Sequence, residues 1–158
     1  MVETWRDVVG YEGRYRVSDQ GNVWSCLTDR LLRQRPTHKG KLQVTLIPAT
    51  GKADKQMVYV HRLVLGAFVG PCPAGMVACH YNDIGTDNRL ENLRWDTPSA
   101  NEYDKVRNGR SVQANKTHCK QGHVFNDENT YIRPDGNRCC RACRKLGMRR
   151  SRAKMRDK

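Results

Sequence analysis

The chain has 158 residues, 37% of them hydrophobic, with only two Phe and a net charge of +13. This length suits one ordinary domain or two small ones, and the composition argues against a single large core. No apolar run approaches the roughly 18 residues of a membrane span, and residues 1–13 lack the basic and then apolar pattern of a secretory signal.

The positive charge is concentrated toward the C-terminal end. Residues 116–158 hold 13 Lys or Arg against 4 Asp or Glu, a net charge of +9, and the first 115 residues carry +4. This asymmetry indicates a polyanionic partner such as nucleic acid, although many small basic proteins are merely soluble. The seven cysteines are odd in number and follow no secretion signal, which disfavours a disulfide framework and favours metal binding by the clustered ones.

Residues 1–70 alternate short apolar runs with polar turns. The segment YRVSDQGNVWS, residues 15–25, predicts a strand, a tight turn and a second strand. Two further strands are expected at 41–47 and 56–60, and residues 61–69 suit a short helix packed on the sheet. We expect Trp5 and Trp24 to belong to the core of this small sheet.

Residues 71–110 predict a strand, a loop, a strand and a helix. The strands are GMVACHY (75–81) and LRWDT (93–97), joined by a polar loop. Thr97 is a suitable helix N-cap with proline directly after it, so we expect a helix that runs to the stop at Gly109. Residues 111–117 form a polar linker.

A zinc site is predicted from the spacing C-x3-H, 16 residues, C-x2-C, which selects Cys119, His123, Cys140 and Cys143. Two ligand pairs separated by one hairpin form a closed tetrahedral site, here in a treble-clef-like finger whose second pair opens a helix. All four positions are filled, which disfavours a catalytic zinc. Cys139 would point away from the ion, and His118 competes with His123 but sits too close to Cys119 to chelate with it. The alternative is four unrelated residues in a basic tail.

The pair Cys79-His80 admits three readings: half of a zinc site, a thiol nucleophile with its base, or part of another catalytic site. A strand hairpin followed by a helix would bring His80 together with Asn92 and Asn101. This arrangement resembles the HNH (ββα-metal) nucleases, particularly the phage nicking homing endonucleases. Upstream, residues 5–25 resemble the nuclease-associated modular motif that precedes such domains, and VHRLVLGAF resembles the segment that joins the two.

The resemblance implies an α+β fold in three parts. These are a small β-rich N-terminal module (residues 1–55), a ββα-metal HNH domain (56–110) and, after the linker, a zinc finger with a basic tail (118–158). It also implies that His80 is the general base, that Asn101 is a metal ligand, and that Asn92 holds the loop and orients His80. A neutral imidazole suits the base role near its ordinary pKa, and a divalent cation such as Mg²⁺ or Mn²⁺ would act as Lewis acid.

Cys79 departs from the family pattern, because the nicking homing endonucleases place a metal-binding Asp at this position. A thiolate is a poor ligand for Mg²⁺. Three outcomes follow: a metal bound weakly by Asn101, waters and DNA phosphates; a preference for a softer ion such as Mn²⁺, Ni²⁺ or Zn²⁺; or loss of cleavage in a protein that mainly binds DNA. A nucleophilic role for the thiol is disfavoured, since no third orienting group is evident.

Candidate DNA contacts lie on two segments. Arg14 and Arg16 alternate with Tyr15 and Val17, so one face of a strand could pack while the other meets phosphate. The helix after Cys143 and its start carry the remaining candidates, Arg141, Arg144, Lys145, Arg149 and Arg150. Either set could equally be a solvated basic face. The tail 149–158 is expected to be disordered or to form a helix on DNA.

The function implied by this reading is a metal-dependent DNA endonuclease, a site-specific nicking or homing-type enzyme of phage origin. It would act on double-stranded DNA as a monomer in the cytoplasm, without a membrane partner. The alternative is a DNA-binding protein that keeps the HNH frame with weak or absent catalysis. A zinc-only RNA-binding protein would leave the central motif unexplained.

Overall fold

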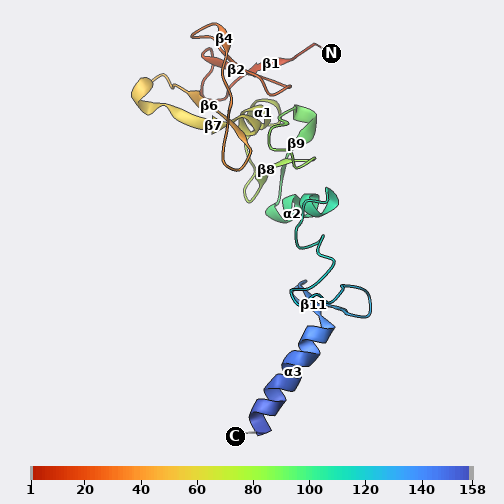
Figure 1. Ribbon diagram of the computed structural model, residues 1–158. Coiled ribbons are helices and arrows are strands. Elements are labelled where there is room, and N and C mark those ends of the chain that lie inside the picture. The colour runs from red at the N-terminus through yellow and green to blue at the C-terminus, as the bar shows by residue number, and fades with distance from the viewer. Residues whose placement is uncertain (1, 157–158) are drawn as a thin grey trace. The chain divides into compact units, whose positions relative to one another are not determined.

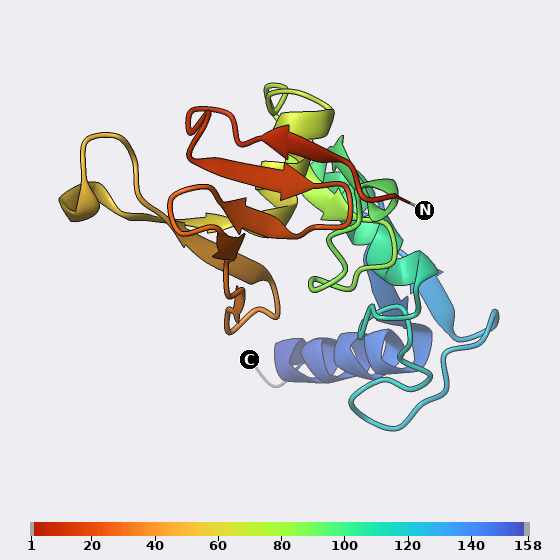
Figure 2. The ribbon, with the colours of Figure 1, turned by 90° about the horizontal axis from the view of Figure 1, so that it is seen from above.

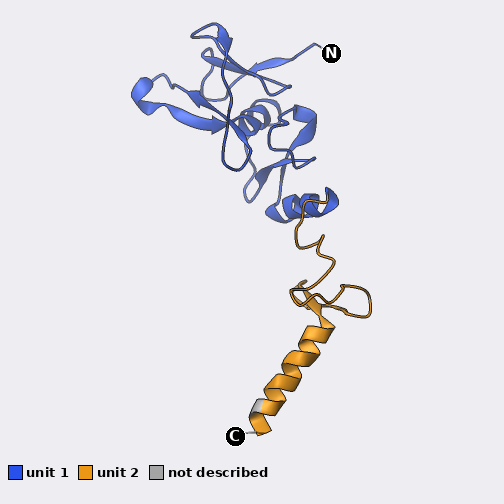
Figure 3. Ribbon diagram, in the orientation of Figure 1, with its two compact units in different colours: residues 1–108 blue, residues 109–158 orange. Residues whose placement is uncertain are grey.

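The computed structural model describes residues 2–156 (Figure 1). These residues fall into two units, the first ending at Asn108 and the second beginning at Gly109 (Figure 3). Within this described range, no helix combines the length and the apolar character needed to cross a bilayer. The fold is mixed α and β, as the resemblance implies. The last two residues of the predicted basic tail lie outside the described residues.

The first unit begins with an antiparallel sheet of four short strands in sequence order. These are β1 (Trp5–Asp7), β2 (Tyr15–Ser18), β3 (Val23–Ser25) and β4 (Arg30–Leu31), and Figure 2 shows the first three side by side in red and orange. The predicted turn between β2 and β3 is confirmed, with Val17 opposite Val23. Gly21 occupies it at φ +82°, a left-handed conformation that favours glycine.

A second antiparallel sheet consists of β5 (Arg35–Pro36), β6 (Leu42–Leu46) and β7 (Gln56–Tyr59), with a 3-10 turn at Lys52–Asp54 in the β6–β7 connection. The two strands expected at 41–47 and 56–60 therefore pair as a hairpin. The helix α1 (Val60–Phe68) follows β7 directly and contacts both sheets.

The core of the first unit forms around α1. Val60, Val64 and Leu65 of the helix are fully buried against apolar side chains of the N-terminal strands and of the later hairpin. One hydrophobic cluster thus extends over both predicted modules, 1–55 and 56–110. The expectation for two tryptophans was wrong: Trp5 and Trp24 are half-buried and lie outside this cluster, and Trp95 packs against it instead.

The predicted strand, loop, strand and helix are confirmed. The strands β8 (Val77–His80) and β9 (Leu93–Asp96) pair in antiparallel register with His80 opposite Leu93, and a 3-10 turn, Leu90–Asn92, precedes β9. The helix α2 (Pro98–Arg107) starts at the expected cap, where the Thr97 hydroxyl oxygen accepts a hydrogen bond from the Ala100 N–H at 3.2 Å. It ends just before Gly109, which has φ +66°.

The second unit contains one hairpin and one long helix. The strands β10 (Thr130–Ile132) and β11 (Arg138–Cys140) pair antiparallel, and α3 (Arg141–Arg156) follows at once. The tail therefore continues the helix after the second cysteine pair as far as the described residues reach. Its basic side chains are exposed along this helix, apart from that of residue 154, which is not described.

Candidate active site and metal centre

The hairpin β8–β9 and helix α2 position the three predicted catalytic residues. His80 is the last residue of β8 and is buried, with 5% of its surface exposed. Asn92 ends the 3-10 turn, and its backbone carbonyl accepts a hydrogen bond from Tyr81 N–H at 2.9 Å. Asn101 lies half-buried in the first turn of α2, which contacts β8.

His80 is buried against the side chains of Asn88 and His61. Its Nε2 atom lies 3.1 Å from the Oδ1 atom of Asn88, and its ring meets the ring of His61 edge-on at a centroid distance of 5.1 Å. Burial lowers the pKa of His80, and the hydrogen bond with Asn88 opposes that shift. His80 is therefore neutral at pH 7, the state in which an imidazole can accept a proton.

Asn92 fixes the loop that connects the two strands. Its Oδ1 accepts a hydrogen bond from Asn82 N–H at 3.0 Å, and its Nδ2 donates to Asn82 Oδ1 at 3.0 Å and to the Asp87 carbonyl at 2.8 Å. These bonds hold both ends of the loop segment 82–87. The side chain that bonds to His80 is Asn88, whereas Asn92 acts on the loop.

Cys79 projects from the opposite face of β8, since successive side chains of a strand alternate. Its thiol is almost fully buried, and burial raises its pKa, so it is protonated at pH 7. Arg94 lies directly opposite Cys79 in the strand register and forms ion pairs with Asp96 at 2.8 Å and Asp104 at 2.5 Å. A protonated thiol beside a guanidinium does not fit a hard divalent cation.

Sequence reasoning missed two residues of this site, Asn88 and His61. His61 lies in the first turn of α1 with 2% of its surface exposed, and burial lowers its pKa to about 3. Its Nδ1 atom is buried without a hydrogen-bond partner among the described residues. A polar residue on the buried face of a short helix was the available signal. The sequence carries no comparable signal for Asn88, because this residue stands in a loop of similar polar residues.

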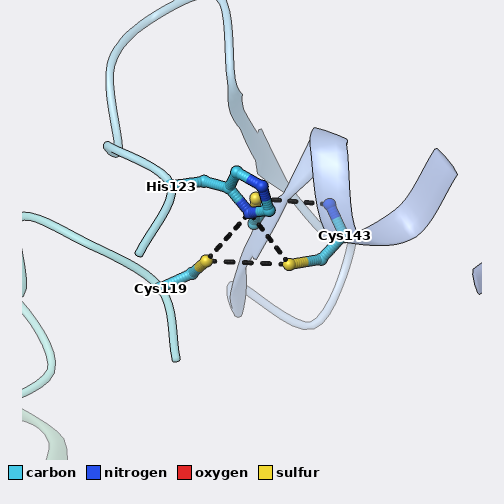
Figure 4. A group of neighbouring side chains, drawn as sticks. Cys119, His123 and Cys143 are labelled. Atoms are coloured by element: carbon cyan, nitrogen blue, oxygen red, sulfur yellow. Dashed lines mark hydrogen bonds between the residues drawn. The ribbon is translucent and has the colours of Figure 1, made fainter. Parts of the chain in front are cut away.

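The second unit brings the four predicted metal-binding side chains together. One donor atom each from Cys119, His123, Cys140 and Cys143 lies within 4.8 Å of the other three, so the group could hold a metal ion. Figure 4 shows three of these side chains, Cys119, His123 and Cys143, pointing toward one another. The Cys143 Sγ lies 3.6 Å from the Cys119 Sγ and 3.3 Å from the His123 Nδ1. Ligands bound tetrahedrally to zinc at about 2.3 Å are separated by roughly 3.8 Å, so the spacing fits.

The neighbouring candidates are not part of this group. Cys139 pairs with Tyr131 across the hairpin β10–β11, and His118 is exposed with its Nδ1 2.9 Å from the Thr117 hydroxyl. The Cys140 sulfur receives a hydrogen bond from the Cys143 backbone N–H at 3.4 Å, which lowers the pKa of Cys140 to about 6. This favours the thiolate that a metal ion requires.

The predicted DNA contacts differ in how freely they can reach a ligand. Arg14 precedes β2, is half-buried and donates to the Ile47 carbonyl at 3.2 Å. Arg16 is exposed on β2 and lies 3.9 Å from Asp7. In the second unit, the guanidinium groups of Arg141 and Arg144 lie over the Tyr131 ring at 5.7 and 4.9 Å. The other candidates on α3 are exposed, namely Lys145, Arg149 and Arg150.

Comparisons with known proteins match the same two segments. Residues 58–103 match the HNH endonuclease family model, and residues 3–47 match that of the NUMOD4 motif. The DNA endonuclease I-HmuI of Bacillus phage SP01 is 32% identical over 106 residues, which is 66% of this chain and 59% of that protein. The uncharacterized HNH endonuclease L247 of Acanthamoeba polyphaga mimivirus is 38% identical over 110 residues, covering 67% of this chain and 27% of that protein.

A solved structure described as DNA binding and cleavage by the HNH homing endonuclease I-HmuI is similar over a longer span. It is 25% identical with a TM-score of 0.61, and the likeness covers 91% of this chain and 83% of that one. The chain spans less than two thirds of the length of both curated relatives. It combines a NUMOD4 motif with an HNH endonuclease domain and is homologous to the phage homing endonuclease I-HmuI.

Proposed function

We propose that this protein is a metal-dependent DNA endonuclease that hydrolyses phosphodiester bonds, with His80 as the general base. The observation that carries the proposal is the buried, neutral His80 at the end of β8, in a hairpin and helix that match the HNH family. In this role His80 accepts the proton of the attacking water. Asn92 keeps the connecting loop in place through its three hydrogen bonds.

Asn101 would hold a catalytic divalent ion through its amide oxygen, because it lies half-buried in the first turn of α2, which contacts β8. Such an ion supplies Lewis-acid stabilisation of the phosphate and the leaving oxygen. Cys79 does not fit as its hard ligand, which leaves waters and DNA phosphates to complete the coordination. Mg²⁺ or Mn²⁺ suits oxygen ligands of this kind.

The proposed substrate is double-stranded DNA, bound by a monomer that nicks one strand. Among the described residues one hairpin, β8–β9, falls within the HNH match, and the relative with a solved structure is described as a DNA-binding and DNA-cleaving homing endonuclease. The net charge of +13 favours binding to a polyanion. We also propose that the protein has a homing role, is of phage origin and acts in the host-cell cytoplasm.

Each predicted segment has a separate role in this proposal. Residues 1–55 and the basic helix α3 would bind DNA, residues 56–110 would cut it, and 111–117 would link them to residues 118–158. In this last segment Cys119, His123, Cys140 and Cys143 would hold a structural Zn²⁺, supported by their mutual distances.

The second candidate is a DNA-binding protein with little or no catalysis, and the buried thiol of Cys79 beside Arg94 favours it. The two candidate functions are distinguished by incubating the protein with supercoiled DNA that carries the sequences flanking its own gene. Nicked circles that form with Mg²⁺ or Mn²⁺ and not with EDTA support the nuclease. A retarded band with no cleavage under any of these conditions supports the binding protein.

A further inference from the structure

Asn88 is the residue that hydrogen-bonds to His80, and no family pattern or sequence argument above selected it. It lies in the loop between β8 and β9 with 4% of its surface exposed. Its Oδ1 is 3.1 Å from the His80 Nε2, and both side chains are buried. The contact is therefore shielded from water, which makes it stronger and more directional than an exposed one.

An amide oxygen only accepts hydrogen bonds, so this contact requires a proton on His80 Nε2. In the neutral imidazole the other nitrogen, Nδ1, then carries the lone pair. Nδ1 becomes the atom that takes the proton from water. The Asn88 Nδ2 is buried without a partner among residues 2–156, so a carboxylate at this position would keep the acceptor and lose no hydrogen bond. Its charge would, however, raise the pKa of His80.

The N-terminal module determines where Asn88 lies. The turn between β2 and β3 touches the loop backbone: the Asp19 carbonyl accepts a hydrogen bond from Leu90 N–H at 2.7 Å. A Cβ atom added at Gly21 would lie 2.7 Å from the Asn88 Cβ and 2.9 Å from the Asn88 carbonyl oxygen. Real Cβ atoms do not approach that closely, so any other residue at position 21 must displace Asn88 or the turn.

A second close approach joins the same loop to the N-terminal module. A Cβ atom added at Gly85 would lie 2.8 Å from the Gly40 carbonyl oxygen, in the turn before β6. Gly21 in the N-terminal module and Gly85 in the loop thus allow the two backbones to approach closely. The loop that carries Asn88 is packed against residues that the family comparison assigns to the NUMOD4 motif.

We propose that Asn88 is a positioning residue that fixes the tautomer and orientation of His80, and that the turn at 18–22 of the N-terminal module holds Asn88 in place. The inference rests on the proposed function of His80 as base. It gives the N-terminal module a second task beside DNA contact, since the catalytic loop depends on it for its shape.

The test compares Asn88→Leu with Asn88→Asp, and Gly21→Ala with Gly10→Ala. Leu removes the acceptor at similar size, whereas Asp keeps it. Gly10 has φ +78° with nothing within 4 Å of an added Cβ, so its variant imposes the same backbone strain without touching Asn88. Nicking is measured at saturating protein, DNA binding is measured without added Mg²⁺ or Mn²⁺, and tryptophan fluorescence verifies folding.

We expect Asn88→Leu and Gly21→Ala to lower the nicking rate constant by about 10- to 100-fold with an unchanged dissociation constant. Gly10→Ala should stay within about threefold of the wild type. Asn88→Asp should fall between the wild type and Asn88→Leu, because it keeps the acceptor but its charge raises the pKa of His80. Equal rates for the Leu and Asp variants would overturn the role of Asn88. Equal rates for the two glycine variants would overturn the role of the turn.

A readout that needs no cleavage separates this inference from the proposed function. Long-range ¹H–¹⁵N spectra of the free full chain report which ring nitrogen of His80 carries the proton. We expect the proton on Nε2 in the wild type and in Asn88→Asp, and a mixture of tautomers in Asn88→Leu. A proton on Nδ1 in the wild type would overturn the inference even if the protein nicks DNA, and a wild type that fails to nick would overturn only the proposed function.

Discussion

His80 owes its proposed role to burial and to a single polar neighbour. Desolvation lowers its pKa, and the same burial lowers the pKa of His61 to about 3, so both rings are neutral at pH 7. Two uncharged imidazoles can meet at 5.1 Å without repulsion. The contact between the two rings therefore requires a pH at which neither imidazole carries a positive charge.

Acid should destabilise the first unit through His61. Its folded pKa of about 3 lies below the ordinary value of 6.5, so the unfolded chain binds the extra proton first. The contribution to stability is complete above pH 6.5 and is lost as the pH falls toward 3, at up to about 1.4 kcal/mol per pH unit. Denaturant unfolding followed by tryptophan fluorescence measures it, since all three tryptophans lie in this unit.

The matched variant for this prediction is His61→Phe, which keeps a ring and removes the titration. The free energy of unfolding of the variant should fall less between pH 6 and pH 4 than that of the wild type. Parallel pH dependence of the two proteins would show that His61 is not the buried neutral group described above.

Cys79 is the residue at which this chain departs from the HNH pattern that it resembles. A protonated thiol on the face of β8 opposite to His80 should contribute nothing to Mg²⁺ binding. We therefore expect Cys79→Ala to retain the Mg²⁺-dependent nicking rate within about threefold. A large loss of Mg²⁺-dependent nicking in Cys79→Ala would show instead that the sulfur binds the catalytic ion.

At the scale of elements, we expect the hairpin β10–β11 and the start of α3 to depend on a metal ion held by the Cys/His cluster. The second unit buries few apolar side chains, so four ligands on one ion would supply the constraint that a core supplies elsewhere. The adjacent cysteines 139 and 140 allow a controlled test, because only Cys140 belongs to the cluster.

Cys140→Ser should lose the bound zinc and the helical signal of α3, and Cys143→Ser should do the same. Cys139→Ser should keep one zinc per chain. Metal analysis of the purified proteins and far-ultraviolet circular dichroism measure both properties. Purified wild type without zinc, or loss of zinc from the Cys139 variant, would contradict the ligand assignment.

The elements themselves followed from local patterns in the sequence. Three such patterns depend only on neighbours close in the chain, and each appeared as expected. They are the cap at Thr97 and Pro98, the alternation in 15–25 and the C-x2-C spacing. The contacts that sequence reasoning missed join distant segments: Asn88 with Gly21, and His61 with His80. The core role expected of Trp5 and Trp24 failed for the same reason, because Trp95 packs against the core and they do not.

For the whole molecule, the two family matches describe one folded unit. The NUMOD4 match at 3–47 and the HNH match at 58–103 share a single hydrophobic cluster around α1. The segment that matches the NUMOD4 motif and the segment that matches the HNH endonuclease family are therefore stabilised together. The cluster of Cys119, His123, Cys140 and Cys143 and the helix α3 belong to the other unit.

DNA binding should weaken as salt rises, because Lys and Arg release counterions from phosphates. Replacing both Arg149 and Arg150 of α3 by Gln should reduce the slope of log affinity against log salt by about 2, provided that each contacts one phosphate. Titrations of labelled duplex DNA at several salt concentrations measure this slope. An unchanged slope would remove these two side chains of α3 from the proposed DNA interface.

The central claim is that His80 performs the chemistry, and the rate of strand nicking tests it most directly. Wild type and His80→Ala are each incubated at saturating concentration with supercoiled DNA that carries the flanking sequences of the gene, in Mg²⁺ and in Mn²⁺. We predict that the wild type produces nicked circles and that His80→Ala is slower by about 10²- to 10⁴-fold with unchanged DNA binding. Nicking by His80→Ala at the wild-type rate, or no nicking by the wild type in either metal, would contradict the account.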